Sequence, residues 1–145
     1  MSQADQKAPH ERTREDFLAL TEGDILDLRG KDLDAACARL CMQDVEYLAE
    51  YDSWTVVDEG RHWWFEPSTR LTSAAFAYES MAKRGWEHCD INLGSGGAFC
   101  RMYALMGMQS IQSESKNVCC SGKTEAEART MACVLAAWKD GQYEK

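Results

Sequence analysis

The sequence SGKTEAEARTMACVLAAW, residues 121–138, decides much of the fold. Thr124 and Glu127 have the spacing of a capping box, in which a threonine and a glutamate satisfy the free N–H groups at a helix start. Apolar side chains then recur at helical spacing and share one face: Met131, Val134, Leu135 and Trp138. We therefore expect a helix over 124–138, followed by a frayed tail from Lys139.

Two earlier segments have the same helical spacing. In the first, Asp32 can cap a helix whose apolar face is Leu33, Ala36, Cys37, Leu40 and Cys41. In the second, which opens at Ser68 or Thr69, the face is Leu71, Ala74, Ala75, Tyr78, Met81 and Ala82. Gly85 suits the left-handed position that ends a helix. These patterns predict helices over 32–42, weakly continued toward Tyr47 and Leu48, and over 70–84.

Strands are expected between the last two helices. Cys89, Ile91 and Leu93 alternate with polar residues, which is the period of a half-buried strand over 86–93. The run from Gly94 to Gly97 suits a hairpin loop, and a second strand should follow over 98–106. A weaker third strand is predicted between Met108 and Cys120. Residues 52–67 show neither period and are predicted to be irregular.

The order of these elements predicts an α+β fold. A chain of 145 residues matches one domain with one core. Residues 1–12 are polar and predict a disordered tail, and a short helix broken at Gly23 is possible within 13–28. The domain is expected to span 13–138. In it, a small antiparallel sheet is covered by the helices at 70–84 and 124–138, with the helix at 32–42 packed beside them.

Charge and cysteine content narrow the classes of partner. The net charge is −8, with 16 basic residues scattered among 24 acidic ones, so nucleic acid is not expected as a partner. No apolar run approaches the roughly 18 residues of a membrane span, and the N-terminus lacks a signal-peptide pattern, so no membrane partner is expected. The seven cysteines lie mostly in apolar segments, which predicts reduced thiols and a cytoplasmic protein.

Three segments together resemble the phage ABA sandwich domain family: GKDLDAACARLCM, PSTRLTSAAFAYESMAKRGW and the stretch at 121–138. The matching positions are Leu33-Asp34, Trp63-Trp64, Ser68-Thr69, Gly85-Trp86 and Thr124 to Trp138, across residues 30–138. The two central strands are richer in cysteine and methionine than this family leads us to expect, and the loop before Pro67 is longer. The resemblance implies an ABA sandwich-like fold and a phage or prophage accessory protein. It carries over no catalytic motif.

The run His62-Trp63-Trp64-Phe65 is the most unusual local feature. Neighbouring side chains in an extended chain point in opposite directions, so some of these rings must stay partly exposed. They could form an aromatic wall for a planar ligand or a partner, or they could hold a loop onto the sheet. We hypothesise that one of the two tryptophans binds and the other anchors. The candidate ligand-binding residues are Arg61, His62, Trp63, Trp64 and Arg70.

Other chemistry is weakly indicated. The glycine-rich run at 94–97 precedes a strand, whereas a phosphate loop precedes a helix. His88, Cys89, Cys119 and Cys120 lack the spacing of zinc ligands, so no metal and no cofactor are expected. A nucleophile motif is missing. Asp58, Glu59 and Glu66 could do acid–base work beside His62, although carboxylates are common on an acidic surface.

Three classes of function remain. The first is a phage or prophage non-enzymatic accessory binding protein, for example a counter-defence protein that sequesters a nucleotide-like small molecule or a host protein in the host cytoplasm. The second is an acidic protein that inhibits a host enzyme by surface mimicry, and the third is an unrecognised hydrolase. A pocket that contains Trp63, Trp64 and Arg61 or Arg70 would favour the first class, a flat acidic face the second, and a carboxylate–histidine pair in a cleft the third. An oligomer is compatible with all three.

Overall fold

The computed structural model describes residues 7–58, 61–103 and 117–143. Within these residues, the long helices are α4 (Gly30–Cys41), α5 (Leu71–Ala82) and α6 (Glu125–Tyr143). One antiparallel sheet contains β1 (Val45–Leu48), β2 (Ser53–Asp58) and β3 (Arg61–Phe65), and the other contains β4 (His88–Gly94), β5 (Gly97–Tyr103) and β6 (Asn117–Gly122). The short elements are η1 (Pro9–Glu11), α2 (Arg14–Leu18) and α3 (Glu22–Leu26). The predicted α+β class is therefore confirmed, with two small sheets in place of one.

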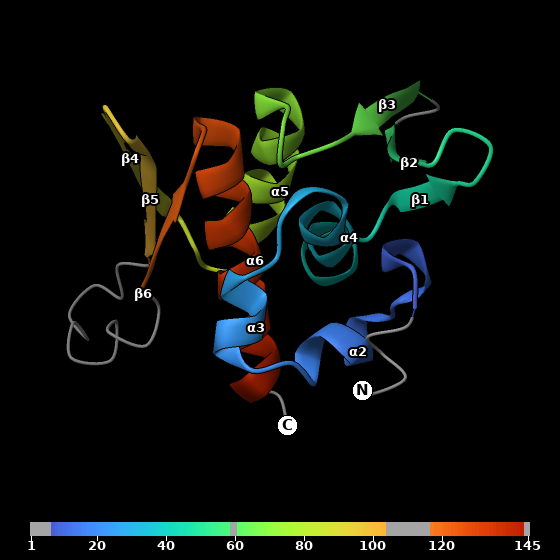
Figure 1. The fold of residues 1–145 in the computed structure, drawn as a ribbon, viewed down its shortest axis with the longest axis horizontal. Coiled ribbons are helices and arrows are strands. Elements are labelled where there is room, and N and C mark those ends of the chain that lie inside the picture. Colours follow the sequence, from blue (N-terminus) through green and yellow to red (C-terminus); the bar gives the residue numbers. More distant parts are fainter. Residues whose placement is uncertain (1–6, 59–60, 104–116, 144–145) are drawn as a thin grey trace.

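Helix α6 runs through the centre of the molecule, with β4–β6 on one side and α4 with the first sheet on the other (Figure 1). Every residue from Thr130 to Ala137 is buried, which includes the predicted core residues Met131 and Leu135. At its start, Glu127 N–H donates to Thr124 Oγ1 at 3.2 Å, while Glu127 Oε1 accepts from Lys123 N–H at 2.9 Å. The expected capping pair is thus present, with the glutamate reaching one residue further back than in a standard box.

The end of α6 does not fray as the sequence suggests. The helix continues through Tyr143 because its last turns pack on the N-terminal elements. Gln142 Nε2 donates to Leu18 O at 2.9 Å, and Trp138 Nε1 donates to Leu20 O at 3.1 Å. These contacts join residues that are far apart in the sequence, so the charged composition of the tail alone could not predict them.

The second sheet forms the expected hairpin. Gly94 pairs with Gly97, so the turn lies within the predicted loop. The inner face of the sheet packs on α6 through Ala98, Cys100, Met102, Val118 and Cys120, all of which are buried. Strand β5 ends at Tyr103, and the rest of the predicted second strand, with the first part of the third, lies outside the described residues.

The first sheet corrects two predictions. Residues 52–67 were expected to be irregular, yet they contain β2 and β3, and the weak helical continuation toward Tyr47 and Leu48 is β1. The alternation is hidden in β2 because Thr55 is buried along with Trp54 and Val56. Thr55 Oγ1 donates to the backbone carbonyl of Trp63 at 2.9 Å, which satisfies a polar side chain at a buried position.

Helix α5 begins at Leu71, two residues after Thr69, which is the later of the two expected starts. Its buried face is also rotated from the predicted one. The buried residues are Ser73, Ala74, Ala77 and Met81, whereas Leu71 is 50% exposed, Ala75 is exposed and Tyr78 is half-buried. The predicted core position of Leu71 is therefore wrong. Ser73 takes the inner position because its hydroxyl donates to Trp64 O at 3.0 Å and accepts from Glu66 N–H at 3.1 Å.

The other helical predictions have mixed outcomes. All five predicted face residues of α4 are buried, but the helix begins at Gly30, with Arg29 and not Asp32 at the capping position. Gly85 has a φ of 105°, as its predicted position after α5 requires. Helix α5 packs on α6 and only weakly on α4, so the prediction that it covers the sheet is wrong.

Residues 1–12 were predicted to be a disordered tail, yet η1 forms within them, at Pro9–Glu11; residues 1–6 lie outside the described residues. Arg39 of α4 donates to the carbonyl oxygens of Arg12 and His10 at 3.1 and 3.0 Å, which fixes η1 against the domain. Across residues 7–58, 61–103 and 117–143, no helix has both the length and the apolar composition that crossing a bilayer would require.

A leucine-to-alanine substitution should cost much more stability in the buried part of α6 than on the exposed side of α5. Leu135→Ala should lower the free energy of unfolding by roughly 2–5 kcal/mol, because it empties a fully packed position. Leu71→Ala should lower it by about 0.5 kcal/mol, the usual range for a surface change, because Leu71 is half exposed. Urea denaturation of both variants measures the two values. Equal losses would contradict the placement of Leu71 on the outside of α5.

Candidate functional site

A groove lies between strand β3 and helix α5. Its volume is about 570 Å³, and it is lined by Trp63, Trp64, Arg70, Thr72, Ala75, Phe76 and Glu79. Strand β3 is the edge of its sheet, and the chain passes from it directly into the turn before α5 (Figure 1). Because β3 is an edge strand, side chains from both of its faces can border one groove beside that edge.

The two tryptophans of β3 are both exposed. Trp63 pairs with Val56 and Trp64 with Thr55, so the two indoles leave opposite faces of the strand. Their exposed fractions are 46% and 41%, while Phe65 is fully buried. The hypothesis that one tryptophan anchors the segment is therefore wrong, because Phe65 is the anchor. Trp64 contacts the ring of Tyr51 edge-on, with 5.4 Å between ring centroids.

Helix α5 supplies the opposite wall. Thr72, Ala75, Phe76 and Glu79 follow the spacing i, i+3, i+4 and i+7, so they form one stripe on the side of α5 that turns away from its buried face. Sequence reasoning missed this stripe. The signal in the sequence was the apolar run from Ala74 to Ala77. Four consecutive residues point in all directions around a helix, so Ala75 and Phe76 cannot face α6 when Ala74 and Ala77 do.

Among the described side chains that line the groove, Arg70 and Glu79 carry charge. Arg70 lies at the start of α5, with its Nε 3.7 Å from Glu66 Oε1, and both side chains are well exposed. A surface ion pair with this separation contributes little to stability, so the guanidinium can exchange Glu66 for a ligand at small cost. Glu79 places a carboxylate in the same lining.

The structure brings together three of the five predicted binding residues. Trp63, Trp64 and Arg70 line the groove, as the first class of function requires. The backbones of Arg61 and His62 lie in the same strand, at the end away from Phe65, and their side chains lie outside what the structure describes. The same holds for the side chains of Asp58 and Glu59, so the predicted acid–base group around His62 lies outside the described side chains.

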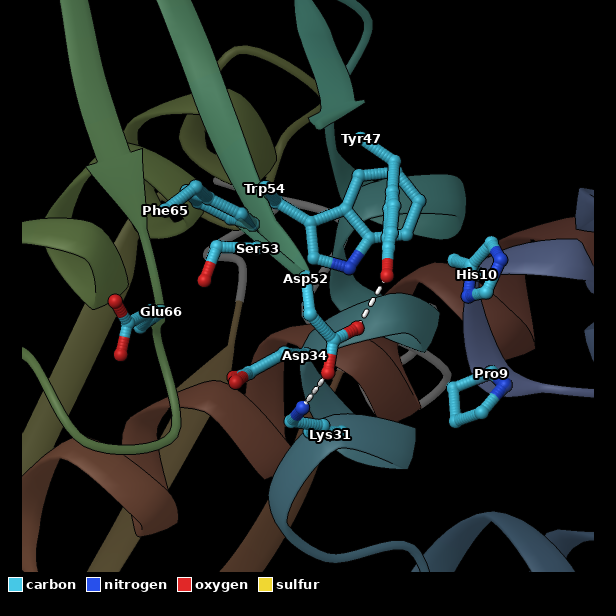
Figure 2. A pocket seen from close by; sticks show the side chains of 10 residues that line it. All are labelled: Pro9, His10, Lys31, Asp34, Tyr47, Asp52, Ser53, Trp54, Phe65 and Glu66. Atoms are coloured by element: carbon cyan, nitrogen blue, oxygen red, sulfur yellow. Dashed lines mark hydrogen bonds and ion pairs between the residues drawn. The ribbon is translucent and has the colours of Figure 1, made fainter. Parts of the chain in front are cut away.

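A smaller polar cavity of about 80 Å³ lies where α4 meets the first sheet and η1 (Figure 2). Figure 2 shows Lys31 and Tyr47 both directed at the carboxylate of Asp52, with which they form an ion pair and a hydrogen bond. The ring of His10 stacks on Tyr47, with 4.0 Å between centroids. These groups satisfy one another, so the cavity is best explained as the polar joint that holds η1 against the first sheet.

Asp34 also lines this cavity, and its side chain is half-buried. Burial raises its pKa, while the hydrogen bond that its Oδ1 accepts from Ser68 N–H at 2.8 Å acts in the opposite direction, and the charge of Glu66 raises the pKa further. Asp34 thus joins α4 to the turn before α5. Its hydrogen bond explains why the chain at Ser68 is fixed before the helix begins.

Metal and phosphate sites are not supported in the described part of the chain. No group of three or more His, Cys, Asp or Glu side chains there could hold a metal ion. His88 stacks on Tyr103, with 5.1 Å between centroids. The start of α6 lies near the 94–97 turn. There Glu127 N–H donates to Thr124 Oγ1, and the Glu127 carboxylate, which accepts from Lys123 N–H and lies 3.7 Å from Arg29 Nε, places negative charge at this end of the helix.

Comparisons of the chain with protein-family models, with curated proteins and with solved structures give no match. The resemblance to the phage ABA sandwich domain therefore stays a prediction.

The β3 aromatic residues should differ sharply in their contribution to stability. Phe65→Ala should lower the free energy of unfolding by roughly 3–5 kcal/mol, because the ring is fully buried. Trp63→Ala and Trp64→Ala should each lower it by about 1 kcal/mol, because nearly half of each indole already faces solvent. Chemical denaturation of the three variants measures this, and a Trp64→Ala loss as large as that of Phe65→Ala would contradict the assignment of Phe65 as the anchor.

Asp34→Asn should stabilise the protein at neutral pH. The raised pKa means that the folded state favours the protonated form, so stability from this group is complete below its unfolded pKa and is lost as pH rises through its folded pKa. Asparagine keeps the acceptor for Ser68 N–H and carries no charge. The difference in melting temperature between variant and wild type should be largest at pH 7 and should shrink on acidification. A variant less stable than the wild type at pH 7 would show that the charge itself is stabilising.

Proposed function

We propose that this protein is a non-enzymatic binding protein whose groove between β3 and α5 holds a planar, nucleotide-like small molecule. The observation that carries the proposal is the meeting of Trp63, Trp64 and Arg70 in one groove, two half-exposed indoles beside one exchangeable guanidinium. Stability does not require either indole to be exposed, whereas stacking on a ligand does.

The chemistry of the lining defines the ligand class. A volume of about 570 Å³ lies within the usual range of small-molecule sites. An aromatic base can stack on an indole, and Phe76 with Ala75 supplies an apolar floor. Arg70 offers a fork of N–H donors to a phosphate or carboxylate. Glu79 disfavours a ligand with many negative charges and can accept an N–H from a base edge.

The resemblance to the phage ABA sandwich domain supports a biological setting for this proposal. A phage or prophage accessory protein that sequesters a small signal molecule would need a binding groove and no catalytic machinery. On this basis we propose a counter-defence role in the cytoplasm of the host cell. A host protein that inserts a planar side chain into the groove is the alternative occupant.

Titration calorimetry with variants tests the proposal. The probes are the nucleoside 5′-monophosphates and the 3′,5′-cyclic nucleotides, each also compared with its uncharged nucleoside. Trp63→Ala or Trp64→Ala should weaken binding of the best probe by roughly tenfold or more, the usual value of one base–aromatic stack. Arg70→Gln should reduce the preference for the nucleotide over the nucleoside and leave nucleoside binding nearly unchanged.

The matched control is Phe99→Ala, which removes an aromatic residue that is 55% exposed on the other sheet. It should bind every probe as the wild type does. Binding that survives in both tryptophan variants, or that is lost equally in Phe99→Ala, would contradict the assignment of the groove.

A further inference from the structure

Two cysteines of the second sheet lie in contact. Cys89 is on β4 and pairs with Met102, while Cys100 is on β5 and pairs with Ile91. Both side chains therefore point to the same face of the sheet, as diagonal neighbours on adjacent antiparallel strands. Their Sγ atoms are 3.3 Å apart. The distance is that of a thiol hydrogen bond, and all seven cysteines of the structure are free.

The two thiols differ in access and in surroundings. Cys100 is fully buried against α6, whereas Cys89 is half-buried because β4 is the edge strand. Arg129 of α6 places Nη1 3.8 Å from Cys89 Sγ, and its Nε lies 2.9 Å from Glu125 Oε2. The other titratable groups that act on this thiol are Asp90 beside it in β4, and Tyr78 and Cys133, which face it from α5 and α6.

These surroundings favour a thiolate at Cys89. The hydrogen bond from Cys100 is the largest cause that lowers the pKa of Cys89 to about 7, and the charge of Arg129 lowers it further against the effects of burial, Asp90 and Glu125. The same contact raises the pKa of Cys100, which keeps its proton. A half-exposed thiolate beside a protonated buried thiol is the arrangement of an attacking and a resolving cysteine.

We propose that Cys89 and Cys100 form a hydroperoxide-reactive dithiol that closes to a disulfide. The Cys89 thiolate attacks one peroxide oxygen, the O–O bond breaks, and the released alkoxide or hydroxide takes a proton from water. Cys89 is then a sulfenic acid. Cys100 Sγ attacks that sulfur, the S–S bond forms, the S–O bond breaks, and the departing hydroxide takes the Cys100 proton and leaves as water. Two thiols lose two electrons in total, and the peroxide gains them.

The fold favours disulfide formation between Cys89 and Cys100 over reaction at the other cysteines. Closing a 3.3 Å contact to an S–S bond of about 2.05 Å shortens the distance between the two sulfur atoms by roughly 1.3 Å, and β4 has a sheet neighbour on one side only. The pKa values of Cys37, Cys133 and Cys120 are raised by burial, so these thiols hold their protons. Cys119 is exposed but lies on the opposite face of the sheet, across from Arg101.

Peptide mapping of the full chain tests the proposal. The protein is exposed to a stoichiometric amount of hydrogen peroxide at pH 7, its free thiols are alkylated under denaturing conditions, and it is digested with trypsin without reduction. Cleavage after Arg84 and Arg101 gives one peptide, residues 85–101, that contains both cysteines. We expect this peptide to be two hydrogens lighter and unalkylated. Further cleavage before Asp90 should leave its two halves joined until a reductant is added.

Variants separate a reacting pair from a contact without chemistry. In Cys100→Ser, the hydroxyl can still donate to Cys89 but cannot form a disulfide, so Cys89 should stop at the sulfenic acid, which dimedone traps. Arg129→Gln should slow alkylation of Cys89 at pH 7 by roughly 3- to 10-fold and leave the rate unchanged at a pH where the thiol is fully ionised, while Arg129→Lys should restore most of it. Cys119→Ser is the matched control and should form the disulfide as the wild type does.

Two results would overturn the proposal. One is a wild-type peptide 85–101 that stays doubly alkylated while Cys119 is oxidised. The other is dimedone labelling of Cys89 that is equal in the wild type and in Cys100→Ser, which would show that Cys100 does not resolve it. A circular dichroism melt of each variant confirms that it is folded at the temperature of the assay.

Discussion

The burial of α6 on nearly all sides is the constraint on which the rest of the structure depends. An ordinary surface helix has one apolar stripe, whereas every residue of α6 from Thr130 to Ala137 is buried. Alanine at positions 132, 136 and 137 allows the neighbouring elements to approach closely. At Gly122 even a methyl group would lie 2.6 Å from the backbone nitrogen of Ala128. The second sheet, α4 and α5 are thus placed by their contact with one helix.

This arrangement leaves one side of α5 and the edge strand β3 outside the centre of the core. Because α5 gives Ala74, Ala77 and Met81 to the core, Phe76 lies at the margin of the core, where it is only half-buried. The first sheet is held through Trp54, Val56 and Phe65, with the guanidinium of Arg39 lying 5.0 Å from the Trp54 ring. Its edge strand β3 therefore passes beside α5 with two indoles that the core does not use. The proposed binding groove is the space between these two indoles and the outer side of α5.

The parts of the fold that depend on local pattern could be predicted from the sequence. The face of α4, the capping pair of α6 and the hairpin turn at Gly94 and Gly97 are local and were predicted correctly. The first sheet was missed because Thr55 is buried through a hydrogen bond to another strand, which hides the alternation. The rotation of α5 likewise depends on Ser73 meeting Trp64 and Glu66, seven to nine positions away. In the groove, Trp63 and Trp64 could be predicted because they are adjacent in an aromatic run. The position of Phe76 depends on helix packing, and the Cys89–Cys100 contact depends on strand register, so neither could be predicted.

The proposed groove between β3 and α5 should bind its ligand without any change in the core. The chain has five tryptophans, and their indole N–H signals in a ¹⁵N–¹H correlation spectrum report on each position separately. Trp54 and Trp86 are buried, and Trp86 Nε1 donates to Asp140 at 2.9 Å. On titration with a binding nucleoside monophosphate, the signals of Trp63 and Trp64 should shift together and saturate, while those of Trp54, Trp86 and Trp138 should not move. Shifts confined to the last three tryptophans would place the ligand elsewhere and contradict the account.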